Sequence, residues 1–216
     1  MIAGMISSDQ PRLGREWYDS FHRYKQQVAR NNPWNTLAKV DELLATNRLL
    51  GFDFTSIVKM NMQQQLSGLE SKLRSDELDR RLQASYREIQ EAFRSTEHID
   101  SLPTKRFDDI SGLRDCHDMD LIYRDQLYQM NYVLLDFWCV ELVHKLRNSS
   151  ADGRELQRLA MKACHIVEAM QYSGQERNTP VFAFHAPLTI AIPYLPIDGV
   201  HINWARHMFA AIERSG

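Results

Sequence analysis

Apolar residues recur at steps of three and four along most of this chain, which is the spacing of helices that bury one face. The first such run follows a loose segment over residues 1–11 and ends at Asn31-Asn32-Pro33. A second predicted helix extends from Trp34 to Leu50, where Gly51 provides an end signal. The residues expected to face inward in these two helices are Trp17, Phe21, Tyr24, Val28, Leu37, Val40, Leu43, Leu44 and Leu50.

Residues 52–97 admit two interpretations. They form either two short antiparallel helices or one long helix whose apolar seam pairs with a partner. The apolar run is interrupted at Ser75-Asp76-Glu77, where a serine and two acids suit a new helix start. Ser101-Leu102-Pro103 closes the segment, because proline cannot continue a helix. The apolar positions of this segment are Met62, Leu66, Leu69, Leu73, Leu78, Leu82, Ile89 and Phe93.

The longest predicted helix lies in the second half of the chain. It follows a linker over residues 104–117 and extends over Met119–Arg147. Between Tyr132 and Val143 it is apolar on nearly every side. A helix that is apolar all round is usually buried by several neighbours, so we expect this one to be the central helix of a bundle.

The last part of the chain predicts two more helices. A surface turn over residues 148–153 precedes a helix over Arg154–Tyr172. A proline-punctuated apolar stretch over residues 180–196 then leads to a terminal helix over residues 204–216. No run alternates in the manner of a strand. The predicted fold is therefore an all-α, single-domain helical bundle of about eight helices over residues 12–216.

Composition narrows the function classes. The 216 residues are 44% hydrophobic and 25% charged, enough for one domain with a substantial core. The net charge of -2 and the isoelectric point near 6.4 give no attraction to phosphates, so this chain alone is not expected to bind nucleic acid. Neither a secretory signal nor an apolar stretch of about 18 residues is present, which predicts a nuclear or cytoplasmic protein without membrane contacts.

Familiar catalytic motifs are missing from the sequence. It contains no glycine-rich phosphate loop, no G-x-S-x-G elbow, no H-E-x-x-H pair and no C-x-x-C. The three cysteines, Cys116, Cys139 and Cys164, are too far apart to form a zinc site and are typical of reduced thiols. We therefore predict no catalytic, cofactor-binding or metal-binding residues and no bound cofactor.

Two acidic clusters are candidates for a metal site. Asp108-Asp109 is similar to the aspartate-rich metal motif of terpene cyclases, but Gly112 and Leu113 occupy the positions where further carboxylates would be needed, which favours an acidic turn in a linker. His117-Asp118 is similar to the His-Asp pair that binds a divalent cation in helical metal-dependent phosphohydrolases. No other histidine or aspartate has a suitable spacing, so carboxylates at the start of a long helix are the preferred interpretation.

The other histidines carry weaker hypotheses. Neighbouring helical residues point about 100° apart, so Cys164 and His165 are not expected to act as nucleophile and base. His144 ends an apolar helix. His185 lies among aromatic residues, where it either lines a pocket or is a hydrogen-bonded packing residue. Trp138, together with Met130 and Tyr132, is expected in the core rather than in a ligand site.

Four successive segments resemble the fungal-specific transcription-factor domain, the helical region that usually follows a zinc-cluster DNA-binding module. The best match covers residues 104–216, whereas residues 12–100 match only in helical character. The segments are Phe107-Asp108-Asp109-Ile110; the apolar helix through Leu134-Leu135; Ala160–Met170; and Phe184–Ile192 leading to the helix from Trp204 to Ile212-Glu213. The cysteine-rich zinc cluster of that family is absent, and the chain is expected to be a truncated or standalone relative.

The resemblance implies a regulatory or protein-interaction domain that senses a small hydrophobic ligand or a partner and does not bind DNA by itself. A protein partner, or self-association, is expected through residues 52–97. The alternative is an enzyme or ligand-binding protein of fungal secondary metabolism that uses the interior of the same scaffold. A third hypothesis, a metal-dependent phosphohydrolase, depends on His117-Asp118.

Overall fold

A computed structural model describes residues 14–94, 128–147, 152–172 and 184–215 of the chain. Within these ranges every regular element is helical, with seven α-helices, one short 3-10 helix and no strand. The all-α prediction is confirmed, and the helix count is close to the predicted eight. Contacts divide the chain into two compact units, unit 1 over Met1–Glu97 and unit 2 over His98–Gly216.

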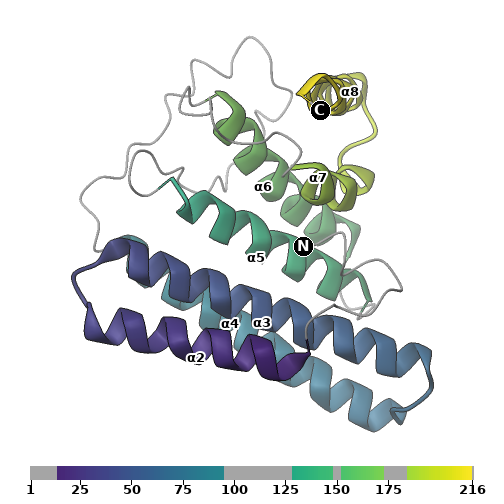
Figure 1. Ribbon diagram of the computed structural model, residues 1–216. Coiled ribbons are helices and arrows are strands. Elements are labelled where there is room, and N and C mark those ends of the chain that lie inside the picture. The colour runs from purple at the N-terminus through teal and green to yellow at the C-terminus, as the bar shows by residue number, and fades with distance from the viewer. Residues whose placement is uncertain (1–13, 95–127, 148–151, 173–183, 216) are drawn as a thin grey trace. The chain divides into compact units, whose positions relative to one another are not determined.

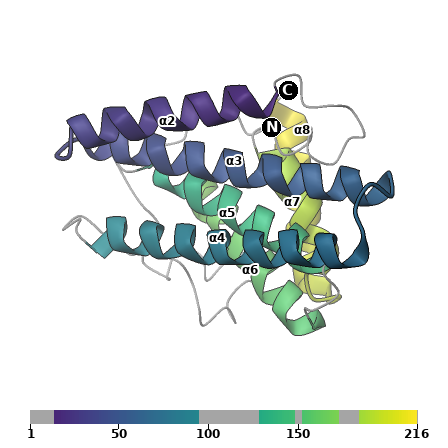
Figure 2. The same cartoon turned by 90° about the horizontal axis from the view of Figure 1, so that it is seen from below.

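Unit 1 contains three long helices that run alongside one another (Figures 1 and 2). They are α2 (Arg15–Asn31), α3 (Thr36–Met62) and α4 (Gly68–Arg94). Helix α3 packs against both neighbours, and its first turn is capped by the Asn35 side chain, which accepts the backbone N–H groups of Leu37 and Ala38. The predicted end of α2 at Asn31-Asn32-Pro33 is confirmed.

An acidic side chain connects the three helices of unit 1. The Asp53 carboxylate on α3 is 8% exposed and pairs with Arg15 of α2, at 3.0 Å, and with Arg81 of α4. Both arginines remain partly exposed, so only the carboxylate loses most of its water. Two opposite charges offset the cost of burying this acid.

The predicted helix boundaries in the middle of the chain were wrong. Helix α3 does not end at Gly51 but continues to Met62, because Gly51 is buried between the core residues Leu50 and Phe54. Packing there outweighs the roughly 1 kcal/mol that a glycine costs inside a helix. The break falls at residues 63–67, and α4 starts at Gly68 rather than at Ser75. Residues 68–94 are therefore one long helix, antiparallel to the end of α3.

A capping box explains the true start of α4. The Ser67 hydroxyl accepts the Glu70 backbone N–H at 3.2 Å, and the Glu70 carboxylate accepts the Ser67 backbone N–H at 2.9 Å. The Ser67 hydroxyl also donates to this carboxylate at 2.8 Å, and the two hydrogen bonds from Ser67 to the carboxylate, that of the backbone first, lower the pKa of Glu70. The Ser-x-x-Glu spacing of a capping box is present in the sequence from Ser67 to Glu70, whereas the predicted helix start was Ser75.

Several residues expected to face inward are exposed. The side chains of Leu78, Leu82 and Ile89 are buried as predicted. By contrast, apolar residues on α2, in the first turn of α3 and near the turn between α3 and α4 are exposed. A helix in a three-helix unit packs along only part of its surface. The exposed ones are Trp17, Tyr24, Leu37, Met62, Leu69 and Leu73.

Unit 2 is built around a buried helix, α5 (Met130–Arg147), which packs against α6 (Gly153–Tyr172) and α7 (His185–Ala191). The apolar stretch of α5 is buried on nearly all sides, as its sequence predicted. The predicted bounds of α6 are confirmed to within one residue. The part of the long predicted helix before residue 128 lies outside the described residues.

From Phe184 on, the proline-punctuated stretch forms a short helical connection. Helix α7 leads directly into the 3-10 helix η5 (Ile192–Tyr194), and Leu195 then turns the chain into an extended conformation. The last helix, α8 (Gly199–Ser215), starts five residues earlier than the predicted Trp204. Within the described ranges, no helix combines the length and the apolar character needed to cross a membrane.

Candidate functional site

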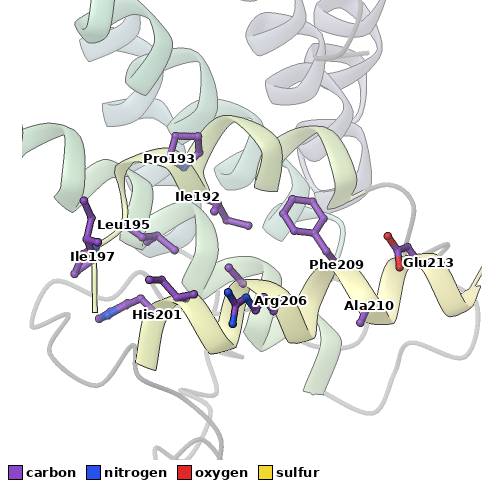
Figure 3. A pocket seen from close by; sticks show the side chains of 12 residues that line it. Ile192, Pro193, Leu195, Ile197, His201, Arg206, Phe209, Ala210 and Glu213 are labelled. Carbon is purple, nitrogen blue, oxygen red and sulfur yellow. The ribbon is translucent and has the colours of Figure 1, made fainter. Parts of the chain in front are cut away.

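An apolar groove of about 430 Å³ lies between α8 and the η5 segment of unit 2 (Figure 3). Three polar side chains, those of His201, Arg206 and Glu213, also border it. The apolar residues that line it are Ile192, Pro193, Leu195, Pro196, Ile197, Ile202, Ala205, Phe209 and Ala210. All nine come from the last quarter of the chain, and those on α8 share one face of that helix.

The polar residues are spread along the groove. His201 lies at one end, beside Leu195 and Ile197, and Glu213 lies at the other end near Phe209 (Figure 3). Arg206 occupies the middle. The groove is therefore positively charged near its centre, at Arg206, and negatively charged at one end, at Glu213.

His201 is held by the residue that caps α8. The Asp198 side chain accepts the His201 backbone N–H at 2.8 Å, and both of its carboxylate oxygens lie 2.8 Å from the His201 ring atom Nδ1. The backbone hydrogen bond, followed by the ring contact, lowers the pKa of Asp198. The capping acid therefore stays ionised and fixes the orientation of the imidazole.

The other nitrogen of this ring is unpaired within the part of the chain that the structure describes. His201 is 8% exposed, and its Nε2 atom is buried and forms no hydrogen bond with a described residue. Buried polar groups in folded proteins are usually satisfied, so this ring nitrogen is an exception. His201 and Asp198 were not among the site residues predicted from the sequence. The available signal was the Asp-x-x-His spacing at the start of a helix.

A tryptophan attaches α8 to α6. The Trp204 indole Nε1–H donates to the Glu168 carboxyl group at 3.0 Å. Burial raises the pKa of Glu168 from 4.5 to about 7, although the hydrogen bond from Trp204 opposes this shift. This contact holds the groove-forming helix against the core of unit 2.

The cysteine and histidine of α6 are buried beside this contact. Burial raises the pKa of the Cys164 thiol, and burial lowers the pKa of His165 to about 4. Burial likewise raises the pKa of Cys139 on α5. The two thiols stay protonated and are weak nucleophiles at neutral pH.

The remaining sequence candidates have ordinary surroundings. His144 is buried in α5, and the Lys162 ammonium lies 4.1 Å from the ring centre of Trp138. His185 is exposed rather than buried. Its ring and that of Phe209 form a T-shaped pair with 6.0 Å between the ring centres. Met130 is buried in the core. The ring of Tyr132 stacks on that of Phe184, with 6.3 Å between the ring centres.

No cluster of three or more metal-ligating side chains occurs among the described residues. Asp108-Asp109, His117-Asp118 and Cys116 lie outside them.

These features define an all-α protein with an apolar surface groove at its last helix. The chain was compared with models of known protein families, with curated proteins and with solved structures. None of these comparisons gave a match.

Proposed function

We propose that this chain is a regulatory domain of the fungal transcription-factor type, which senses a small hydrophobic molecule and does not bind DNA by itself. The groove along α8 is the observation that carries the proposal. Its volume of about 430 Å³ falls in the range of small-molecule sites, which is on the order of 300–1,000 Å³. Its composition, apolar with a few placed polar groups, is also typical of such sites.

The segments that resemble the fungal domain also supply six of the twelve residues that line the groove. Phe184–Ile192 contributes Ile192, and the helix from Trp204 to Glu213 contributes most of the α8 lining. The resemblance and the groove thus involve the same elements, which supports a ligand-sensing role for this part of the chain.

Contacts with a protein partner are proposed for unit 1. Three apolar side chains near the turn between α3 and α4 are well exposed, Met62 at 75%, Leu69 at 70% and Leu73 at 59%. They lie within the segment for which the sequence predicts a partner or self-association.

One observation favours the alternative function, an enzyme or ligand-binding protein of secondary metabolism. The Asp198–His201 pair has the arrangement in which a carboxylate orients an imidazole for proton transfer. The groove lining includes no serine, threonine or cysteine among the described residues. An enzyme of this kind would use His201 as a general base on the bound molecule and form no covalent intermediate.

Binding of an uncharged apolar dye tests the ligand-sensing role. We expect N-phenyl-1-naphthylamine to bind the full chain at one saturable site with an increase in fluorescence, because the groove excludes water from the dye. Ala210→Trp fills the groove and should weaken binding at least tenfold. Ala211→Trp, at the neighbouring partly buried position outside the lining, should leave binding within about twofold of the wild type.

Two results would contradict the proposal. One is the absence of saturable dye binding by a wild-type chain whose circular dichroism shows the folded helical state. The other is specific DNA binding by the chain alone, measured by the anisotropy of labelled duplexes.

A further inference from the structure

One face of α8 has the residue spacing of a helix that pairs with another helix. Four of its groove-lining residues follow one another at steps of four, three and four, which is the seam spacing of paired helices. They are Ile202, Arg206, Phe209 and Glu213. None of these four side chains is buried, and Ile202 is 39% exposed. The seam is therefore open to a second helix.

Two positions of this seam carry charges of opposite sign. Arg206 lies in the middle of the groove and Glu213 at one end (Figure 3). Both are exposed, and neither forms an ion pair with a residue that the structure describes. They are two helical turns apart, which is about 10 Å along the helix axis. Seam positions are normally apolar, so these charges favour a facing helix that carries the opposite charge at the same height.

We infer that the groove-forming face of α8 binds the same face of a second copy of this chain, with the two α8 helices antiparallel. The two-fold axis passes between Phe209 and Ala210, midway between the two charges. Arg206 of each copy then lies opposite Glu213 of the other copy, and two reciprocal ion pairs form. A parallel arrangement would place like charges opposite each other, so the charges select the antiparallel one.

The apolar part of the groove supplies the rest of this interface. At the axis, the ring of Phe209 from one copy faces the small side chain of Ala210 from the other. Ile202 faces the last turn of the other α8. Ile197, which is 95% exposed, extends the apolar surface at the same end of the groove. Removal of such apolar surface from water is the main favourable contribution to association.

The inference goes beyond the proposed function, because association of two copies needs no ligand. A ligand in the groove would occupy the surface that the second copy covers, so the two would exclude each other. The small molecule of the proposed function would therefore favour the single chain.

Charge reversal in the full chain tests the two ion pairs. Sedimentation equilibrium of the wild type should show a monomer–dimer equilibrium below about 0.5 mM. Arg206→Glu and Glu213→Arg each place two pairs of like charges across the axis, so each should weaken association about tenfold or more. Arg214→Glu makes the same charge change at an exposed position of α8 outside the groove and should leave association unchanged.

A mixture of the two variants gives the sharpest measurement. One Arg206→Glu chain and one Glu213→Arg chain have opposite charges at both contacts, so the mixture should associate at concentrations where neither variant does alone. The double variant, Arg206→Glu with Glu213→Arg, should associate for the same reason. Circular dichroism checks that each variant keeps the helical content of the wild type.

The outcomes separate this inference from the proposed function. The inference is overturned by a wild-type chain that stays monomeric up to about 0.5 mM, or by a dimer that neither charge reversal weakens. A mixture of folded variants that associates no better than each variant alone also overturns it. Dimers of the mixed variants together with a wild-type chain that binds no dye would overturn the proposed function alone. Saturable dye binding by a chain that stays monomeric would overturn this inference alone.

Discussion

At the scale of single residues, the polar side chains buried in α6 and α8 explain how the groove is kept in place. Glu168 and Trp204 are both buried and connect the two helices. The raised pKa of Glu168, to about 7, means that its carboxyl group is partly protonated at neutral pH. The attachment of α8 is therefore expected to respond to pH.

Glu168→Gln should change the pH dependence of stability. Burial raises the pKa of Glu168 from 4.5 to about 7, so between these pH values the folded chain binds one proton more than the unfolded chain. The stability gained from protonated Glu168 is complete below pH 4.5 and is lost as the pH rises to about 7. The free energy of unfolding of the wild type, minus that of the variant, should fall by about 1.4 kcal/mol per pH unit in this window. Urea unfolding followed by tryptophan fluorescence measures this difference.

His165→Gln is the matched control on the same helix. Burial lowers the pKa of His165 from 6.5 to about 4, so its contribution has the opposite sign and rises with pH between these values. For Glu168→Gln, the difference in free energy of unfolding between wild type and variant must vary with pH. A constant difference would contradict the raised pKa of Glu168.

At the scale of elements, helix α3 ends in a left-handed backbone conformation that its sequence does not predict. Gln64 has φ = 54°, in the left-handed region. The backbone N–H of Gln65 donates to Met60 O at 2.9 Å, and that of Gln64 donates to Asn61 O at 3.0 Å, the two hydrogen bonds of a Schellman motif. Glycine is the usual residue at such a position.

Gln64→Gly should stabilise unit 1. Glycine removes the strain of the left-handed conformation, about 1–2 kcal/mol, but loses more backbone entropy on folding. We expect a net gain of about 0.5–1 kcal/mol, measured by urea unfolding. Gln63→Gly, one residue earlier at φ = -85°, relieves no strain and should be destabilising by a few tenths of a kcal/mol. A destabilised Gln64→Gly variant would contradict the strained-turn interpretation.

The elements also show what the sequence could and could not predict. Apolar spacing was sufficient for the all-α class, the burial of α5 and the bounds of α6, because these depend on side chains within one helix. The end of α3 depends on how Gly51 packs against other helices and on an unusual Gln64 conformation, which spacing does not report. The groove combines η5 with one face of α8, so its residues become neighbours only after folding. The capping spacing of Asp198 and His201 was visible, but the missing partner of Nε2 was not.

At the scale of the whole molecule, the described residues form two helical units with different surfaces. Unit 1 has its helices joined by the Asp53 ion pairs and leaves apolar side chains exposed near its α3–α4 turn. Unit 2 has a buried core around α5 and the groove along α8. The proposed regulatory function assigns partner binding to unit 1 and ligand binding to unit 2.

Nuclear magnetic resonance locates the ligand site directly and needs no substitution. The ¹⁵N-labelled full chain is titrated with N-phenyl-1-naphthylamine and the backbone amide shifts are followed. We expect the largest changes in the groove residues, from Ile192 to Ile197 and from His201 to Glu213, with small changes in α2, α3 and α4. Largest changes in unit 1, or no saturable changes at any amide, would contradict the assignment of the groove as the functional site.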